Sequence, residues 1–92
     1  MTASCGAQAP GAPVIGLVLV GSGEGTLRLE KRLRCAAAGL GLALNLEVRK
    51  DHEAMGIPLA DTPAVLLEGR TVFAGLPRTE EIEAWLRQTR DA

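Results

Sequence analysis

The run VIGLVLVGSGEGT at residues 14–26 constrains the fold more than any other stretch of the chain. Its first seven residues are Val, Ile and Leu with a single Gly, which is typical of a buried strand in a sheet that is covered on both faces. A glycine-rich turn follows, and glycine permits the positive φ angles that tight turns need. We therefore expect a parallel or mixed sheet around a strand at 14–20, with a helix that starts directly after the turn.

Length and composition narrow the class of protein. The chain has 92 residues, enough for one small domain, and contains one Phe, one Trp and no Tyr, so it lacks stacking platforms for nucleic-acid bases. Ten basic and eleven acidic residues leave a net charge of -1, which provides no basic surface for DNA or for an anionic membrane. The expected partner is therefore a protein segment or a small molecule, not a nucleic acid or a membrane.

The first thirteen residues, MTASCGAQAPGAP, are rich in Ala, Gly and Pro, so we expect a disordered tail at 1–13 and one folded domain at 14–92. The apolar run after the tail is short and has no basic residue before it, which fits neither a signal peptide nor a membrane span. We expect a cytoplasmic protein. In that reducing compartment Cys5 and Cys35 should be free thiols, and their spacing is not that of a metal site.

Hydrophobic periodicity and turn residues predict the other elements. In chain order we expect a helix at about 25–40, a half-buried strand at 42–49, a short helix at 51–55, an extended segment at 57–63, a hairpin of strands at 64–67 and 71–74, and a last helix at about 77–90. The order is β-α-β-(short α)-β-β-α. The predicted fold class is α/β, with a four-stranded mixed sheet flanked by helices.

This order, together with TPAVLLEGRTVFAGLP at residues 62–77 and the following Glu80-Glu81-Ile82, resembles the thioredoxin and glutaredoxin superfamily of redox homeostasis. More narrowly, it is similar to the small single-domain glutaredoxin-like proteins called redox-active disulfide proteins. The segment has that family's succession of Thr-Pro, apolar strand, Gly turn, strand and Gly before the last helix. The resemblance covers about residues 14–88 and implies a thioredoxin-like fold with a cis peptide bond between Thr62 and Pro63.

The catalytic Cys-x-x-Cys of that family is missing. When the family's Gly-x-Gly-Cys-x-x-Cys is aligned with this chain, Glu24 replaces the first cysteine and Leu27 the second. Neither side chain can attack or resolve a disulfide, so dithiol-disulfide exchange by the family mechanism is excluded. The resemblance then implies a degenerate active site, without a cofactor, in which the glycine turn still faces Pro63.

The turn and the Thr-Pro pair together form the candidate binding groove. Its residues are Ser22, Gly23, Glu24, Gly25, Thr26, Thr62 and Pro63. One alternative is that Pro63 only fixes the entry to the third strand. Another is a phosphate-binding glycine loop, but the P-loop lysine is missing and Glu24 would occupy the anion position. In the simplest interpretation Glu24 complements the helix dipole and Ser22 caps the helix.

The remaining reactive side chains are weaker candidates. Cys35 would lie about 13 Å along the helix from Thr26, so it cannot replace the missing nucleophile in place. It could still act as a partly exposed redox thiol, with or without Cys5. A disulfide between Cys5 and Cys35 is geometrically allowed, although no feature of the sequence indicates one. His52 stands without a second ligand, so neither a metal site nor catalysis is expected there.

Three functions are compatible with these patterns. The leading hypothesis is a non-catalytic thioredoxin-fold module that binds a protein segment or small ligand at the corner where the turn from Gly21 to Thr26 faces Thr62 and Pro63. The second is a monothiol redox or thiol-sensing protein that uses Cys35. The third is a structural subunit that assembles through an exposed strand or helix edge.

Overall fold

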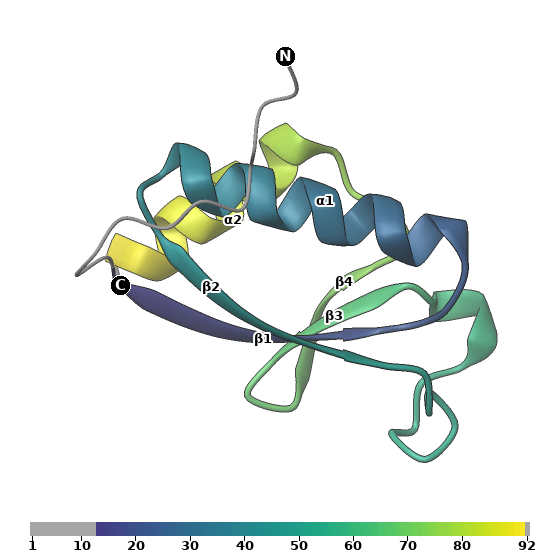
Figure 1. Ribbon diagram of the computed structural model, residues 1–92. Helices are drawn as coiled ribbons and strands as arrows, with labels where there is room; N and C mark the ends of the chain where they lie inside the picture. The colour runs from purple at the N-terminus through teal and green to yellow at the C-terminus, as the bar shows by residue number, and fades with distance from the viewer. Residues whose placement is uncertain (1–12, 92) are drawn as a thin grey trace.

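The computed structural model describes residues 13–91 and is shown in Figure 1. Its elements are, in order, β1 (Val14–Val20), α1 (Glu24–Gly39), β2 (Ala43–Arg49), the 3-10 turn η1 (Leu59–Asp61), β3 (Ala64–Leu67), β4 (Arg70–Ala74) and α2 (Thr79–Asp91). The strands form one four-stranded sheet in the order β2-β1-β3-β4. β1 is parallel to β2 and antiparallel to β3, and β4 is antiparallel to β3.

These observations confirm the prediction of an α/β domain with a four-stranded mixed sheet. β1 and β3 have the predicted bounds, and β2, β4 and the two long helices differ from prediction by one or two residues at their ends. The hairpin is also confirmed, because Glu68 and Gly69 have φ angles of 51° and 80°. Two successive positive φ angles are the signature of a tight two-residue β-turn.

The predicted tail falls almost entirely outside the described residues. Pro13 is the exception, and its carbonyl accepts a hydrogen bond of 2.8 Å from the N–H of Ala43. The ladder between β1 and β2 therefore begins one residue earlier than predicted.

Both helices pack on the same face of the sheet (Figure 1), and the main core lies between the helices and the sheet. Its largest fully buried side chains come from β1, α1, β3 and α2: Leu19, Leu29, Leu33, Val65, Ile82 and Leu86. Full burial of a side chain of this size contributes about 1.5–3 kcal/mol. The predicted apolar face of the first helix is therefore the face that holds the domain together.

The opposite face of the sheet is only partly covered. A second buried cluster is formed by Val20, Ala64 and Leu66 from the strands and Ile57 from the loop after β2. At the other end of β1, Val14 is 69% exposed. The expectation of a strand buried on both faces is thus wrong for the first half of β1, because both long helices of the described residues, α1 and α2, pack on the other face.

The short helix predicted at 51–55 is absent, and residues 52–56 form consecutive turns instead. His52 closes these turns through both its backbone carbonyl and its side chain, and both contact the backbone of Ile57. Its backbone carbonyl accepts the N–H of Ile57 at 2.9 Å, and its Nδ1 lies 2.8 Å from the Ile57 carbonyl oxygen. A side chain that bonds to nearby backbone in this way competes with helix formation.

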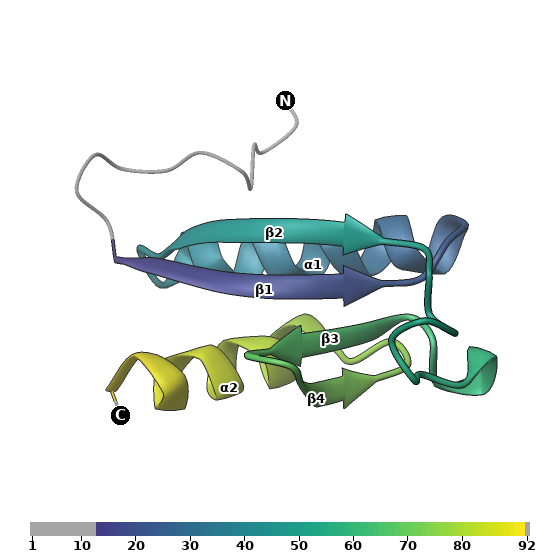
Figure 2. The same ribbon diagram turned by 90° about the horizontal axis from the view of Figure 1, so that it is seen from below.

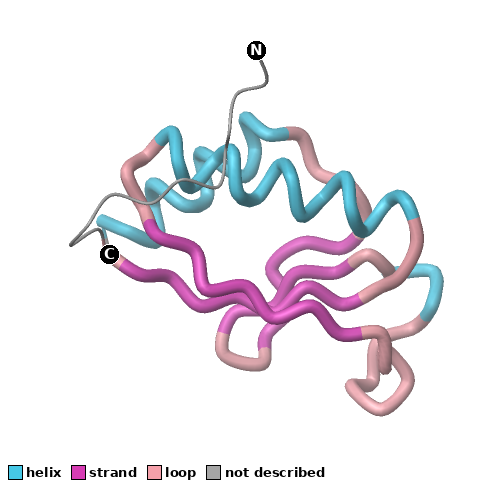
Figure 3. The backbone as a smooth tube through the Cα atoms, in the orientation of Figure 1, coloured by secondary structure: helices cyan, strands magenta, loops and turns pink. Residues whose placement is uncertain are grey.

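The segment predicted to be extended at 57–63 is interrupted by η1, the short helical turn before β3 (Figure 3). The hydroxyl and the N–H of Thr62 both donate to the carbonyl of Leu59, at 2.6 and 3.1 Å. These two bonds fold the chain back just before Pro63. Flanking prolines favour extended backbone, but here a local side-chain hydrogen bond overrides that preference.

Candidate functional site

The end of β1, the start of α1 and the loop before β3 meet at one corner of the sheet. We call residues 21–26 and 62–63 the Pro63 corner. The peptide bond between Thr62 and Pro63 is cis, as the family resemblance implied. The carbonyl of Pro63 accepts a hydrogen bond from the N–H of Gly75, and the N–H of Gly21 donates to the carbonyl of Arg49, each at 2.8 Å. Both halves of the corner are therefore fixed to the sheet.

Gly21 is the point of contact between the glycine turn and the Pro63 loop. Its φ angle is 152°, and a methyl group on its α-carbon would lie 3.2 Å from the Cα of Pro63 and 2.6 Å from the Oγ1 of Thr26. Only a residue without a side chain fits this position. Gly25 also approaches the proline, since a methyl group there would lie 4.0 Å from the Cδ of Pro63. The structure thus brings the turn and Pro63 together, and Gly21, the first residue of the predicted turn, is the point of closest approach.

Thr26 is a buried polar residue at this corner, with 4% of its surface exposed. Its hydroxyl donates to the carbonyl of Ser22 at 3.2 Å and so closes the first turn of α1. The N-cap residue, Gly23, provides no side-chain hydrogen bond to the helix. The expectation that the Ser22 side chain caps the helix is therefore wrong, because Ser22 contributes through its backbone carbonyl.

Glu24 and Leu27 lie on the outer surface of α1. The side chain of Glu24 is 87% exposed and lies 3.8 Å from the guanidinium of Arg28, while Leu27 is 65% exposed. The alignment with the family placed Leu27 at the second cysteine, whereas the side chain that reaches Gly21 belongs to Thr26. Of the predicted groove, Gly25 approaches Pro63, whereas Glu24 is solvated and an added methyl group on Gly23 would meet nothing within 4 Å.

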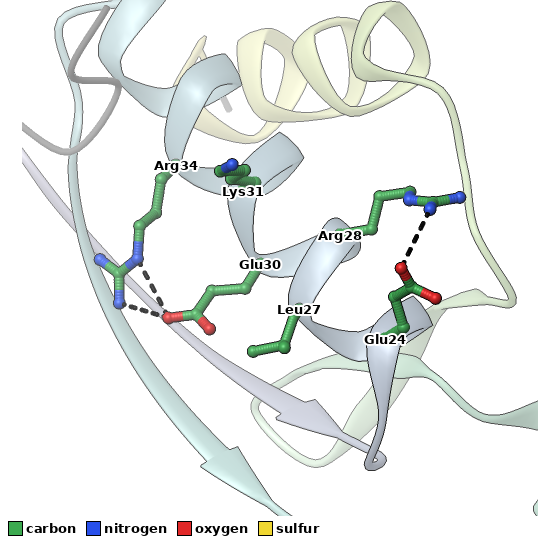
Figure 4. Close-up of a pocket in the computed structure, with 6 residues that line it drawn as sticks. All are labelled: Glu24, Leu27, Arg28, Glu30, Lys31 and Arg34. Carbon is green, nitrogen blue, oxygen red and sulfur yellow. Dashed lines mark hydrogen bonds and ion pairs between the residues drawn. The ribbon is translucent and has the colours of Figure 1, made fainter. Parts of the chain in front are cut away.

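A hollow of about 520 Å³ lies on this outer surface of α1 (Figure 4), lined by Glu24, Leu27, Arg28, Glu30, Lys31 and Arg34. Its charges pair along the helix, and Arg34 approaches Glu30 to 3.1 Å. Pairs of this kind on helix surfaces contribute about 0.3–0.5 kcal/mol each. The hollow is therefore a charged, solvated helix surface, which agrees with the interpretation of Glu24 as a favourable charge at the helix N-terminus.

Three exposed leucines lie on segments that meet at the Pro63 corner. They are Leu27 in the first turn of α1, Leu59 in η1 and Leu76 after β4, with 65%, 70% and 39% of their surface exposed. Leu59 is tied to the corner through Thr62, and Leu76 follows the glycine that bonds to Pro63. Exposed apolar side chains beside a candidate site are available for contact with a partner. Sequence patterns missed Leu59 and Leu76, because their exposure depends on η1 and on the β4–α2 connection.

A bidentate ion pair between Arg49 and Asp51 lies beside the corner, at the C-terminal end of β2. The guanidinium of Arg49 donates to both carboxylate oxygens of Asp51, at 3.0 and 2.6 Å. These hydrogen bonds hold the pKa of Asp51 below its ordinary value of 3.8 and raise the pKa of Arg49. Both side chains are solvated, so the pair steadies the exit of β2 and provides no catalytic group.

The other reactive side chains lie apart from the corner. Cys35 is half-buried on α1 and is disulfide-bonded, which differs from the free thiol that the sequence predicted. Cys5 lies outside the described residues. Among residues 13–91 no group of three or more His, Cys, Asp and Glu side chains is arranged to hold a metal ion. His52, finally, acts as a structural residue of the turn after β2.

The molecule is thus a small α/β domain with a four-stranded mixed sheet, helices on one face and a glycine turn packed against a cis proline. Neither α1 nor α2, the two long helices of the described part, has the length and apolar character that a membrane crossing needs. The chain matches no family model, and neither the curated proteins nor the solved structures contain a match to it. Evidence on its function therefore comes from the corner itself.

Proposed function

We propose that this chain is a non-catalytic binding module with a thioredoxin-like fold, which holds an extended segment of another protein at the Pro63 corner. The observation that carries the proposal is the packing of Gly21 against Pro63, which joins the turn to the loop. No cysteine lies in either segment. The hydroxyl groups of Thr26 and Thr62 both donate to backbone carbonyls. The corner therefore offers surface and backbone groups, and no activated nucleophile.

The chemistry of the corner suits an extended peptide. Leu27, Leu59 and Leu76 expose apolar surface, and its burial is worth about 25 cal/mol per Å². Within residues 13–91 no group donates a hydrogen bond to the carbonyl of Thr62, so this acceptor is available to a ligand. Extended peptides bind through main-chain hydrogen bonds of this kind, with pockets for alternate side chains. A small molecule would favour a more enclosed cavity, so the protein segment is the better candidate.

Peptide selection on the full chain, followed by fluorescence anisotropy titration, tests this function. Leu59→Glu places a charge on the apolar rim, and Val14→Glu is its matched control. The two positions are 70% and 69% exposed, but Val14 lies at the end of β1 that is remote from the corner. We expect Leu59→Glu to raise the Kd of a selected peptide about tenfold or more, and Val14→Glu to leave it unchanged.

Two results would contradict the proposal. One is equal loss of affinity in both variants, which would show that the peptide does not use the corner. The other is a selection in which every peptide that the wild-type chain enriches is also enriched by the Leu59→Glu variant.

A further inference from the structure

The C-terminal half of the outer edge of β2, from Leu46 to Arg49, pairs with no other strand of the described residues (Figure 2). β2 ends the strand order, and among residues 13–91 its ladder partner is β1 alone. Its C-terminal half is solvated, since Val48 is 46% exposed and the side chains of Glu47 and Arg49 are 63% and 43% exposed. Strand edges with unpaired backbone groups are templates for another strand. We propose that this edge pairs, in antiparallel orientation, with the same edge of a second copy of the chain.

The hydrogen bonds to β1 determine which backbone groups of β2 point outward. The N–H of Gly21 donates to the carbonyl of Arg49, so Arg49 bonds toward β1. Bonding alternates along a parallel strand, which assigns Glu47 to the same inner ladder. The N–H and C=O groups of Leu46 and Val48 therefore point to the outer edge, where a second strand can bond to them.

The side chains favour a pairing with its two-fold axis at Val48. This axis sets Val48 opposite Val48 of the second copy, and it sets Leu46 opposite Lys50, the residue that follows β2. Glu47 then lies opposite Arg49 of the second copy, and symmetry repeats this pair. An axis at Glu47 would instead set two Glu47 carboxylates opposite each other, which is unfavourable. Charge complementarity thus favours a second copy of the chain as the occupant of this edge, in the register with its axis at Val48.

The surroundings of the edge allow this pairing. After β2 the chain turns away from the edge and runs toward β3 (Figure 2). On the helix side of the sheet, the exposed apolar side chain of Val48 lies at the edge that a second copy would cover. The Nη1 of Arg49 makes only a 3.9 Å contact with Glu47 of its own chain. In the dimer, Arg49 would instead contact Glu47 of the second copy.

Charge exchange at positions 47 and 49, followed by sedimentation velocity of the full chain over a concentration series, tests the proposal. The wild-type chain should show a reversible monomer-dimer equilibrium. Glu47→Arg alone sets arginines opposite each other, and Arg49→Glu alone sets glutamates opposite each other. Each single variant should raise the dimer Kd about tenfold or more, because two attractive pairs become repulsive. The double variant Glu47→Arg/Arg49→Glu restores opposite charges and should recover the wild-type Kd, and a mixture of the two single variants should form heterodimers.

The double variant also controls for effects within the chain, because it lacks the Arg49–Asp51 ion pair just as Arg49→Glu does. A wild-type chain that stays monomeric at every concentration would overturn the proposal. So would a dimer that both single variants leave intact, because the interface would then lie elsewhere. Peptide affinity at the Pro63 corner is measured independently, so the dimer can fail while the proposed function stands.

Discussion

The packing of the Pro63 corner makes a quantitative prediction for the variant Gly21→Ala. At a φ angle of 152° a residue other than glycine is strained by about 1–3 kcal/mol. The added methyl group would also lie 2.6 Å from the Thr26 hydroxyl and 3.2 Å from the backbone of Pro63, and overpacking of this kind costs about 1–3 kcal/mol more. Because Thr26 is buried and bonded to Ser22, it cannot easily turn aside. We expect the free energy of unfolding to fall by about 2–6 kcal/mol.

Urea denaturation followed by tryptophan fluorescence measures this change. Trp85 packs edge-to-face on Phe73, with ring centroids 5.6 Å apart, and therefore reports on the core. The control is Gly16→Ala on β1, where an added methyl group meets nothing within 4 Å. It should be within about 1 kcal/mol of the wild type, and on the stabilising side, because alanine restricts the unfolded chain. In a domain of this size a loss of 1 kcal/mol lowers Tm by about 4–8 °C, so the Gly21→Ala variant should melt at least about 8 °C lower.

A double-mutant cycle with Thr26→Ala separates the clash from the backbone strain. If the methyl group meets the Thr26 hydroxyl, Gly21→Ala should cost about 1 kcal/mol less in the Thr26→Ala background than in the wild type. Strain at the φ angle of Gly21 would remain in both backgrounds. A Gly21→Ala chain as stable as the Gly16→Ala chain would refute the packing of the turn against Pro63.

Substitutions on α1 and at the exit of β2 test two other parts of the structure. Leu33→Ala should lower the free energy of unfolding by about 2–5 kcal/mol, because the side chain is fully buried. Leu27→Ala, on the exposed side of α1, should change it by less than about 0.5 kcal/mol. Equal losses of stability in urea denaturation would contradict the assigned core face. The Asp51 carboxyl should titrate below 3.8 in an NMR pH series, because hydrogen bonds from Arg49 favour its charged form. Since the folded pKa is depressed, the stability that this group contributes is present above its unfolded pKa and is lost as the pH falls through the folded pKa. Arg49→Ala should bring the pKa of Asp51 back toward its ordinary value, and a carboxyl that titrates unchanged in this variant would rule out the ion pair as the cause.

Periodicity alone predicts the regular elements of this chain well. The apolar run at 14–20, the one-sided apolar face of α1 and the Gly-containing hairpin each specify their structure through local rules. The loop after β2 was mispredicted, because the hydrogen bonds of His52 and Thr62 to nearby carbonyls outweigh helical and extended propensities. Such bonds leave no periodic signal in the sequence.

The candidate site was predictable only in part, and for a different reason. The resemblance to a known family placed the turn opposite Pro63 and implied its cis peptide bond, which the structure has. The particular role of Gly21 depends on how closely Pro63 approaches it, and the exposure of Leu59 depends on η1. Both are consequences of tertiary packing between segments that are far apart in the sequence. The partly covered face of the sheet is likewise a tertiary feature, since the sequence of β1 by itself predicts a strand that is buried on both sides.

Amide shift mapping of the ¹⁵N-labelled full chain with a selected peptide tests the central claim most directly. If the Pro63 corner is the binding site, the largest shift changes should fall at residues 22–26 and 61–64, and they should saturate with the Kd measured by anisotropy. Val14, at the far end of β1, should not move. Changes concentrated along β2 or in the hollow on α1, or no changes at saturating peptide, would contradict the assignment of function to this corner.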